Sequence, residues 1–163
     1  MTNLVVYTSK LPMPSLPLNS NITYLVSSFS HQFARLLTLS FQKQGIAVTA
    51  EQFAILVLLS QQDGLPQQEI GKRLERDKTT ITRVLINLKK QGLIRQQGNA
   101  SDNRAKSVYL TAQGKRLYAR AVQVAGSLYT NILSGINEKE IRQGVKLLQQ
   151  MNDAIKTAQY YYL

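Results

Sequence analysis

Positive charge is concentrated in the middle of this chain. The segment from Lys72 to Arg116 holds 12 of the 20 lysines and arginines, but only three acids, Glu75, Asp77 and Asp102. Basic side chains at this density attract polyanions, because they raise the local potential and donate hydrogen bonds to phosphate oxygens. The chemistry predicted for this segment is therefore the binding of phosphate groups.

Composition narrows the classes of protein to which the chain can belong. Its 163 residues, 44% of them hydrophobic, are enough for a globular domain, and the net charge of +11 indicates a polyanionic partner. An acidic membrane surface is the competing partner. Binding to such a surface usually needs a basic amphipathic helix, a lipid anchor or a polybasic run of ~4–8 residues, and no such run appears. No apolar stretch approaches the ~20 residues of a membrane-spanning helix. We therefore expect no membrane partner.

Catalytic and metal chemistry are not expected. The chain has no cysteine and a single histidine, His31, which excludes disulfides and zinc sites built on thiolates. Its nine acids are scattered, and no nucleophile–histidine pair or glycine-rich phosphate loop is present. We therefore expect that the protein is not an enzyme and that it binds neither a cofactor nor a metal. The lack of cysteine fits a cytoplasmic protein.

Apolar periodicity and turn residues predict the elements that position the basic segment. Three of the four prolines predict an extended arm over residues 1–19. Helices are expected over roughly 20–45, 49–62, 66–74, 77–91, 111–133 and from 137 onward, with strands over 93–97 and 106–110 around a loop at 98–103 and a weak strand near 63–66. Thr49 with Gln52, and Asn137 with Glu140, have the spacing of capping boxes.

The helix from Lys78 to Gln91 has two distinct faces. Ile81, Val84, Leu85 and Leu88 fall on one side and should pack inward; Thr79, Arg83, Ile86 and Lys90 fall on the other, beside Thr80 and Asn87. Threonine and arginine near the first turns suit the major groove of DNA, where arginine pairs bidentately with guanine. The alternative is an ordinary solvated helix face.

The predicted hairpin carries Arg104 near its tip, with Asp102 two residues earlier. A hairpin beside a recognition helix reaches the adjacent minor groove, where an inserted arginine responds to groove width. Asp102 would then orient the guanidinium of Arg104. The alternative is a surface ion pair that contributes little.

These segments together resemble the MarR family of bacterial regulators. The resemblance lies in residues 67–74 and 77–83 for the helix-turn-helix, 88–94 for the helix exit, and 102–106 with 110–114 for the wing and the following helix. The helix at 49–59, with Gln52 and Phe53, also fits. The arm at 1–19 departs from the shorter N-termini typical of that family.

The resemblance implies a mainly α fold with a small β-hairpin wing. Residues 49–111 would form a winged helix-turn-helix DNA-binding lobe, and residues 20–48 with 112–163 a helical dimerisation region. The apolar stripes of the outer helices would form the twofold interface, although they could instead only close the core of one protomer. A dimer would bind double-stranded DNA at a pseudo-palindromic operator, because two lobes meet two half-sites one turn apart.

The resemblance also implies site residues. Thr79, Thr80 and Arg83 would meet the major groove, and Arg104 the minor groove. The full DNA-binding set expected is Gln67, Gln68, Lys78, Thr79, Thr80, Thr82, Arg83, Asn87, Lys90, Asp102, Arg104 and Lys106. Members of the family often release DNA when a small anionic or aromatic effector binds, and the wall residues expected here are Phe29, His31, Phe33, Arg35 and Phe53. A lone histidine is nonetheless more often structural than a ligand.

Two functions fit this sequence. The first is a dimeric, sequence-specific transcriptional regulator, expected to be a repressor that a small molecule releases. The second is an architectural DNA-binding protein that uses the same basic face without sequence preference. Both should weaken steeply with salt, and only the first should prefer one palindrome over random duplex.

Overall fold

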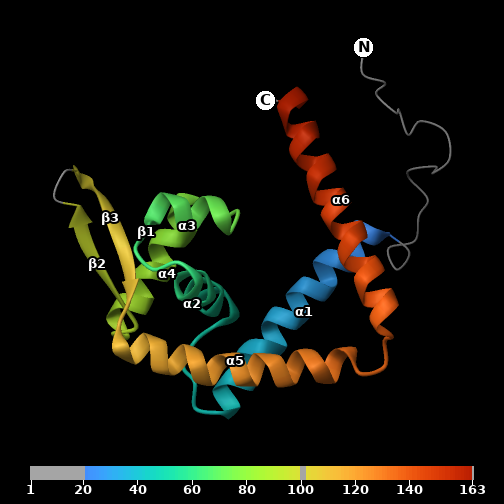
Figure 1. Ribbon diagram of the computed structural model, residues 1–163, viewed down its shortest axis with the longest axis horizontal. Coiled ribbons are helices and arrows are strands. Elements are labelled where there is room, and N and C mark those ends of the chain that lie inside the picture. Colours follow the sequence, from blue (N-terminus) through green and yellow to red (C-terminus); the bar gives the residue numbers. More distant parts are fainter. Residues whose placement is uncertain (1–20, 100–101, 163) are drawn as a thin grey trace. The chain divides into compact units, whose positions relative to one another are not determined.

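The computed structural model describes residues 21–99 and 102–162, with the side chains of residues 21–98 and 106–158. The expected arm over 1–19 lies outside these residues. The elements are α1 (Ile22–Lys43), α2 (Ala50–Gln61), β1 (Leu65–Pro66), α3 (Gln67–Arg73), α4 (Lys78–Lys90), β2 (Ile94–Asn99), β3 (Asp102–Leu110), α5 (Ala112–Leu133) and α6 (Glu138–Tyr162), as Figure 1 shows. This order confirms the predicted fold class, mainly helical with a small hairpin.

Side-chain caps begin two of the helices where the sequence predicted capping boxes. At α2, Gln52 N donates to Thr49 Oγ1 at 3.2 Å and Thr49 N donates to Gln52 Oε1 at 2.9 Å. At α6, Glu140 N donates to Asn137 Oδ1 at 2.9 Å and Asn137 N donates to Glu140 Oε2 at 3.3 Å. Each box satisfies backbone N–H groups that a helix start otherwise leaves unpaired, so both boundaries follow from local sequence.

The first of two compact units reaches from α1 to Ala121 in α5. Its core takes side chains with 0% exposure from five elements: Phe41 of α1, Ile55 of α2, Ile70 of α3, Leu88 of α4 and Val108 of β3. Helix α2 contacts α1, α4 and β3, so it forms the centre of this unit. The basic helix α4 is therefore anchored on a continuous apolar core.

Three antiparallel strands form one sheet in the order β1-β3-β2. Leu65 of β1 pairs with Val108, and Ile94 of β2 pairs with Leu110. Asp63 Oδ1 accepts a hydrogen bond from Leu110 N at 2.9 Å, which joins the turn before β1 to the end of β3. The weak strand predicted near 63–66 is confirmed as β1.

The predicted loop at 98–103 was too long. Strand β2 continues to Asn99 and β3 begins at Asp102, and these two residues pair across a register shift that follows Gly98. The polar composition of this stretch indicated a loop, but ladder hydrogen bonds use only the backbone, so polar residues continue a hairpin beyond its apolar base.

The second compact unit comprises residues 122–163, of which the structure describes 122–162. Helix α5 ends at Leu133 and α6 begins at Glu138, so the predicted division between a helix ending at 133 and one starting near 137 is confirmed. None of the side chains of residues 138–158 is buried, although apolar ones recur along α6. Within the described ranges, no helix is long and apolar enough to cross a membrane.

Candidate nucleic-acid interface

A tight turn joins α3 to α4. Arg76 N donates to Gly71 O at 2.9 Å, and Glu75 adopts a φ of +51°, a left-handed conformation that residues other than glycine rarely adopt. Gly71 is buried, and a Cβ atom there would lie 3.1 Å from Arg76 O. The small residue thus lets the turn fold back closely on α3, which gives the helix-turn-helix its geometry.

Asp77 caps the first turn of α4. Its Oδ1 accepts from Thr80 N at 2.8 Å, and its Oδ2 accepts from Thr80 Oγ1 at 2.7 Å. The backbone hydrogen bond from Thr80, followed by the hydroxyl bond, holds the pKa of Asp77 below its usual value. This cap occupies the hydroxyl of Thr80, one of the residues expected to meet DNA.

The two faces of α4 separate as predicted. Its inward stripe is buried and consists of Ile81, Val84, Leu85 and Leu88. The side chains on the opposite side are exposed, namely Thr79, Arg83, Ile86, Asn87 and Lys90. Ile86 keeps 49% of its surface exposed, so it does not pack beneath another element. The outward face therefore presents hydroxyl, amide, cationic and one apolar side chain on a firmly anchored helix.

Arg83 has a partner that the sequence pattern did not reveal. Its Nη2 lies 3.4 Å from Oε2 of Glu51 in the first turn of α2. The two residues are 32 positions apart, so neither helical periodicity nor a local motif could connect them. Glu51 thus adjoins the residue predicted to read a base.

Thr82 and Gln67 hold α3 against α4. Gln67 Nε2 donates to Thr82 Oγ1 at 2.6 Å, and that hydroxyl donates to Lys78 O at 2.7 Å. Both side chains belong to the predicted DNA-binding set, and the structure brings them together. The side chains of Gln68 and Lys78, from the same set, are exposed.

The hairpin carries a second set of polar side chains. Arg95 on β2 stacks its guanidinium 4.4 Å from the ring centroid of Tyr109, its pairing partner on β3, and donates to Gln97 Oε1 at 2.7 Å. Lys106 is exposed. The backbones of Asp102 and Arg104 lie in β3, but their side chains are outside the described part of the chain.

The residues expected to line an effector site fall into two groups. Phe29 stacks on Phe33 within α1, with ring centroids 5.9 Å apart, and His31 and Arg35 of the same helix are exposed. Phe53 of α2 instead lies against two other aromatic rings, Phe41 at 5.1 Å and Tyr118 at 6.3 Å. Four of these five side chains thus belong to α1 and the fifth to α2, and their role stays a prediction.

Comparison with known proteins places the middle of this chain in a family. The model of the MarR family matches residues 48–106, which include α2, the helix-turn-helix and most of the hairpin. The transcriptional regulator HosA of Escherichia coli O157:H7 is 26% identical over 124 residues, which cover 74% of this chain and 92% of HosA.

Solved structures agree with this match. MepR of S. aureus, solved as a complex with DNA, superposes with a TM-score of 0.74 at 29% identity and covers 82% of this chain and 98% of its own. CouR of Rhodococcus jostii RHA1, solved with p-coumaroyl-CoA, has a TM-score of 0.72 at 21% identity over 84% and 95% of the two chains. Residues 48–106 therefore form a MarR-family segment, and the proteins to which this chain is similar are winged helix-turn-helix transcriptional regulators.

Proposed function

We propose that this protein is a homodimeric, sequence-specific repressor that a small molecule releases from its operator. The observation that carries the proposal is the exposed face of α4 around Arg83, opposite a fully buried stripe. A helix anchored in this way can enter the major groove without losing its packing, and its amide, hydroxyl and guanidinium groups can hydrogen-bond to base edges.

The DNA contacts divide between α4 and the hairpin. We assign base contacts to Thr79 and Arg83, and minor-groove contact to Arg104 with Asp102 as its brace. The DNA complex of MepR, a structure 29% identical to this chain, supports the use of this fold on duplex DNA. The net charge of +11 supplies the attraction to phosphate that both specific and non-specific binding require.

Unpartnered apolar surface supports a homodimer. Helix α1 exposes Leu25 and Phe29 at 46% and 57%, and α6 exposes Val145, Leu148 and Ile155 at 48%, 40% and 55%. Apolar side chains repeated along each of these helices mark an interaction surface on each, and a second copy offers the same stripes in return. We assign residues 20–48 and 112–163 to this dimerisation region.

Sedimentation of the full chain tests the dimer. Leu148→Asp should convert dimers to monomers at micromolar concentration, because it places a charge in an apolar interface. Gln149→Asp introduces the same charge at a neighbouring polar position and should leave the dimer intact. If Leu148→Asp remained dimeric, α6 would not be part of the dimer interface.

Repression would follow from occupancy of the operator by the dimer. A dimer bound where polymerase must bind blocks it without any further contact, and a protein that acts on bacterial DNA works in the cytoplasm. Release by a small molecule is supported by CouR, whose structure with p-coumaroyl-CoA shares this fold. A ligand releases DNA when it binds the DNA-free conformation more tightly than the DNA-bound one.

Selection of duplexes from a random pool tests sequence-specific binding. The selected duplex should be palindromic and bind ~10³-fold or more tightly than random duplex at the same salt concentration. Equal affinity for both duplexes would instead establish an architectural protein that uses the same basic face. Placing the selected sequence over a promoter then shows whether occupancy lowers transcription.

A further inference from the structure

One apolar side chain lies on the outward face of α4. Ile86 keeps 49% of its surface exposed, whereas the other outward residues, Thr79, Arg83, Asn87 and Lys90, are polar or charged. Among the described residues of α2, α3, α4 and the hairpin, Ile86 is the only large apolar side chain that is exposed. A lone exposed apolar residue is common on protein surfaces, so its significance depends on what surrounds it.

The fold itself does not require an isoleucine at this position. The buried stripe of α4 is complete without it, because Ile81, Val84, Leu85 and Leu88 are at most 3% exposed. A β-branched side chain also favours a helix less than lysine, glutamine or glutamate does, because it loses rotamer freedom there. Neither packing nor helix formation therefore accounts for Ile86.

Cationic side chains lie one helical turn to either side of Ile86. Arg83 precedes it by three residues and Lys90 follows it by four, so all three share one face of the helix. The side chain of Arg83 is 70% exposed, and Lys90 is exposed as well. An apolar protein surface laid over Ile86 would have to remove water from both charges, which is costly. This surrounding favours a partner that offers an apolar group between phosphates.

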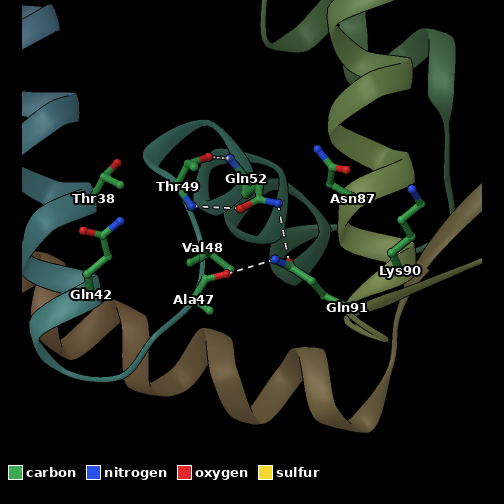
Figure 2. A pocket seen from close by; sticks show the side chains of 9 residues that line it. All are labelled: Thr38, Gln42, Ala47, Val48, Thr49, Gln52, Asn87, Lys90 and Gln91. Atoms are coloured by element: carbon green, nitrogen blue, oxygen red, sulfur yellow. Dashed lines mark hydrogen bonds between the residues drawn. The ribbon is translucent and has the colours of Figure 1, made fainter.

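The adjoining side of α4 borders a cavity of about 480 Å³. Figure 2 shows its lining, which includes Asn87, Lys90 and Gln91 at the end of α4 together with the amides of Gln42 from α1 and Gln52 from α2. Ile86 is not one of the lining residues. Within the first compact unit its side chain is thus presented to solvent and not to the cavity.

We propose that Ile86 determines sequence specificity by contacting the C5-methyl group of a thymine, an inference that rests on the proposed function. Thymine is the base that presents an apolar group in the major groove, between the phosphates of the two strands. The β-branch gives isoleucine one strongly preferred χ1 rotamer in a helix, so its methyl groups are already positioned before DNA binds. Ile86 then reads a base that no hydrogen-bonding side chain needs to contact.

The spacing along α4 also predicts where this thymine lies. Side chains three residues apart on a helix have Cβ atoms about 5–6 Å apart, and successive bases of one strand rise by about 3.4 Å. Arg83 and Ile86 should therefore reach bases no more than about two base pairs apart. The guanine read by Arg83 and the thymine read by Ile86 form one short element in each half-site.

Deoxyuridine scanning of the selected duplex tests the contact, because deoxyuridine lacks only the methyl group of thymine. With the full-length wild-type protein at one salt concentration, a single thymine in each half-site should be sensitive, its replacement weakening binding about fourfold, as expected for one carbon group left unburied. That thymine should lie within about two base pairs of the guanine whose preference is lost in Arg83→Ala.

Ile86→Ala should remove this sensitivity and no other. It should bind the thymine and deoxyuridine duplexes equally at that position and keep the wild-type preference for the guanine. Ile136→Ala is the matched control, because Ile136 is 46% exposed and lies between α5 and α6, outside the residues assigned to DNA binding. Its ratio of thymine to deoxyuridine affinity should equal that of the wild type. Each ratio compares two duplexes with one protein, so a change in overall affinity cancels.

Three results would overturn the inference while a selected duplex still supports the proposed function. They are equal binding of thymine and deoxyuridine duplexes by the wild type at every position, a ratio that Ile86→Ala leaves unchanged, and dissociation of Ile86→Ala into monomers in sedimentation, which would place Ile86 in a protein interface. If the random pool yields no preferred duplex, the proposed function itself fails, and the thymine contact fails with it.

Discussion

The guanidinium of Arg83 and the carboxylate of Glu51 lie 3.4 Å apart, so the arginine at the centre of the outward face of α4 is paired with the first turn of α2. Both side chains are well exposed, and an exposed ion pair of this kind contributes only ~0–1 kcal/mol to stability. The pair nevertheless places an acid of α2 next to the guanidinium of Arg83, so Glu51 can be tested for an influence on how Arg83 meets DNA.

Replacement of Arg83 by alanine should impair sequence readout. We expect Arg83→Ala to weaken binding to the selected duplex by ~1–3 kcal/mol and random duplex by much less, because a bidentate base contact is lost. Fluorescence anisotropy with both duplexes at matched salt measures this. Similar losses of affinity on every sequence would show that Arg83 contacts phosphate and not a base.

Glu51→Gln should have a different signature. Glu51→Gln removes a negative charge beside the face proposed to bind DNA, so it should strengthen binding to random duplex. Because the guanidinium of Arg83 is then freed, the affinity for the selected duplex relative to random duplex should fall. Glu138→Gln, which neutralises an exposed acid on α6, is the control for net charge alone. An unchanged ratio in Glu51→Gln would show that the pair does not orient Arg83.

Leu88 and Ile86 lie on opposite sides of α4 and should respond differently to truncation. Leu88 has 0% exposure, so Leu88→Ala should lower the free energy of unfolding by ~2–5 kcal/mol through lost packing. Ile86 is 49% exposed, and Ile86→Ala should change the free energy of unfolding by no more than ~0.5 kcal/mol. Chemical denaturation measures both; a large loss in Ile86→Ala would mean that this side chain is covered in the folded protein.

Two glycines of α5 make a further matched pair. A Cβ atom on Gly114 would lie 2.0 Å from the backbone oxygen of Leu93, so Gly114→Ala must displace the start of α5 or the segment between α4 and β2 and should be strongly destabilising. Gly126 meets nothing within 4 Å, and Gly126→Ala should stabilise by ~0.5–1 kcal/mol because alanine restricts the unfolded chain. Melting temperatures that fall equally in both variants would contradict this assignment.

The cap of α4 predicts a dependence on acid. The pKa of Asp77 is lowered in the folded protein by its bonds from Thr80, so its contribution to stability is present above the pKa of the unfolded chain and is lost as the pH falls through the folded value. Asp77→Asn keeps an acceptor oxygen without a titrating group. Below about pH 4, the melting temperature of the wild type should therefore fall more steeply than that of Asp77→Asn. If the melting temperatures of the two proteins fell in parallel with pH, Asp77 would not be a source of acid sensitivity.

Much of the fold was predictable because its signals are local. The inward stripe of α4, the cap at Asp77 and the capping boxes at Thr49 and Asn137 each depend on residues within one or two helical turns. Side-chain period and capping chemistry act at that range, so the helix boundaries follow from sequence. The hairpin tip at 98–103 was predicted less well, because backbone pairing there does not depend on apolar side chains.

The sequence by itself determined that this chain folds as a helical protein with a basic, two-faced helix at α4 and a hairpin wing. The tertiary structure alone decided which distant side chains adjoin that helix: Glu51 beside Arg83, Gln67 on Thr82, and the amide-lined cavity next to Lys90. Periodicity assigns a residue to a face, but it holds no information about the partner across the packing interface. The identity of that partner depends on how helices separated by tens of residues pack against a shared core.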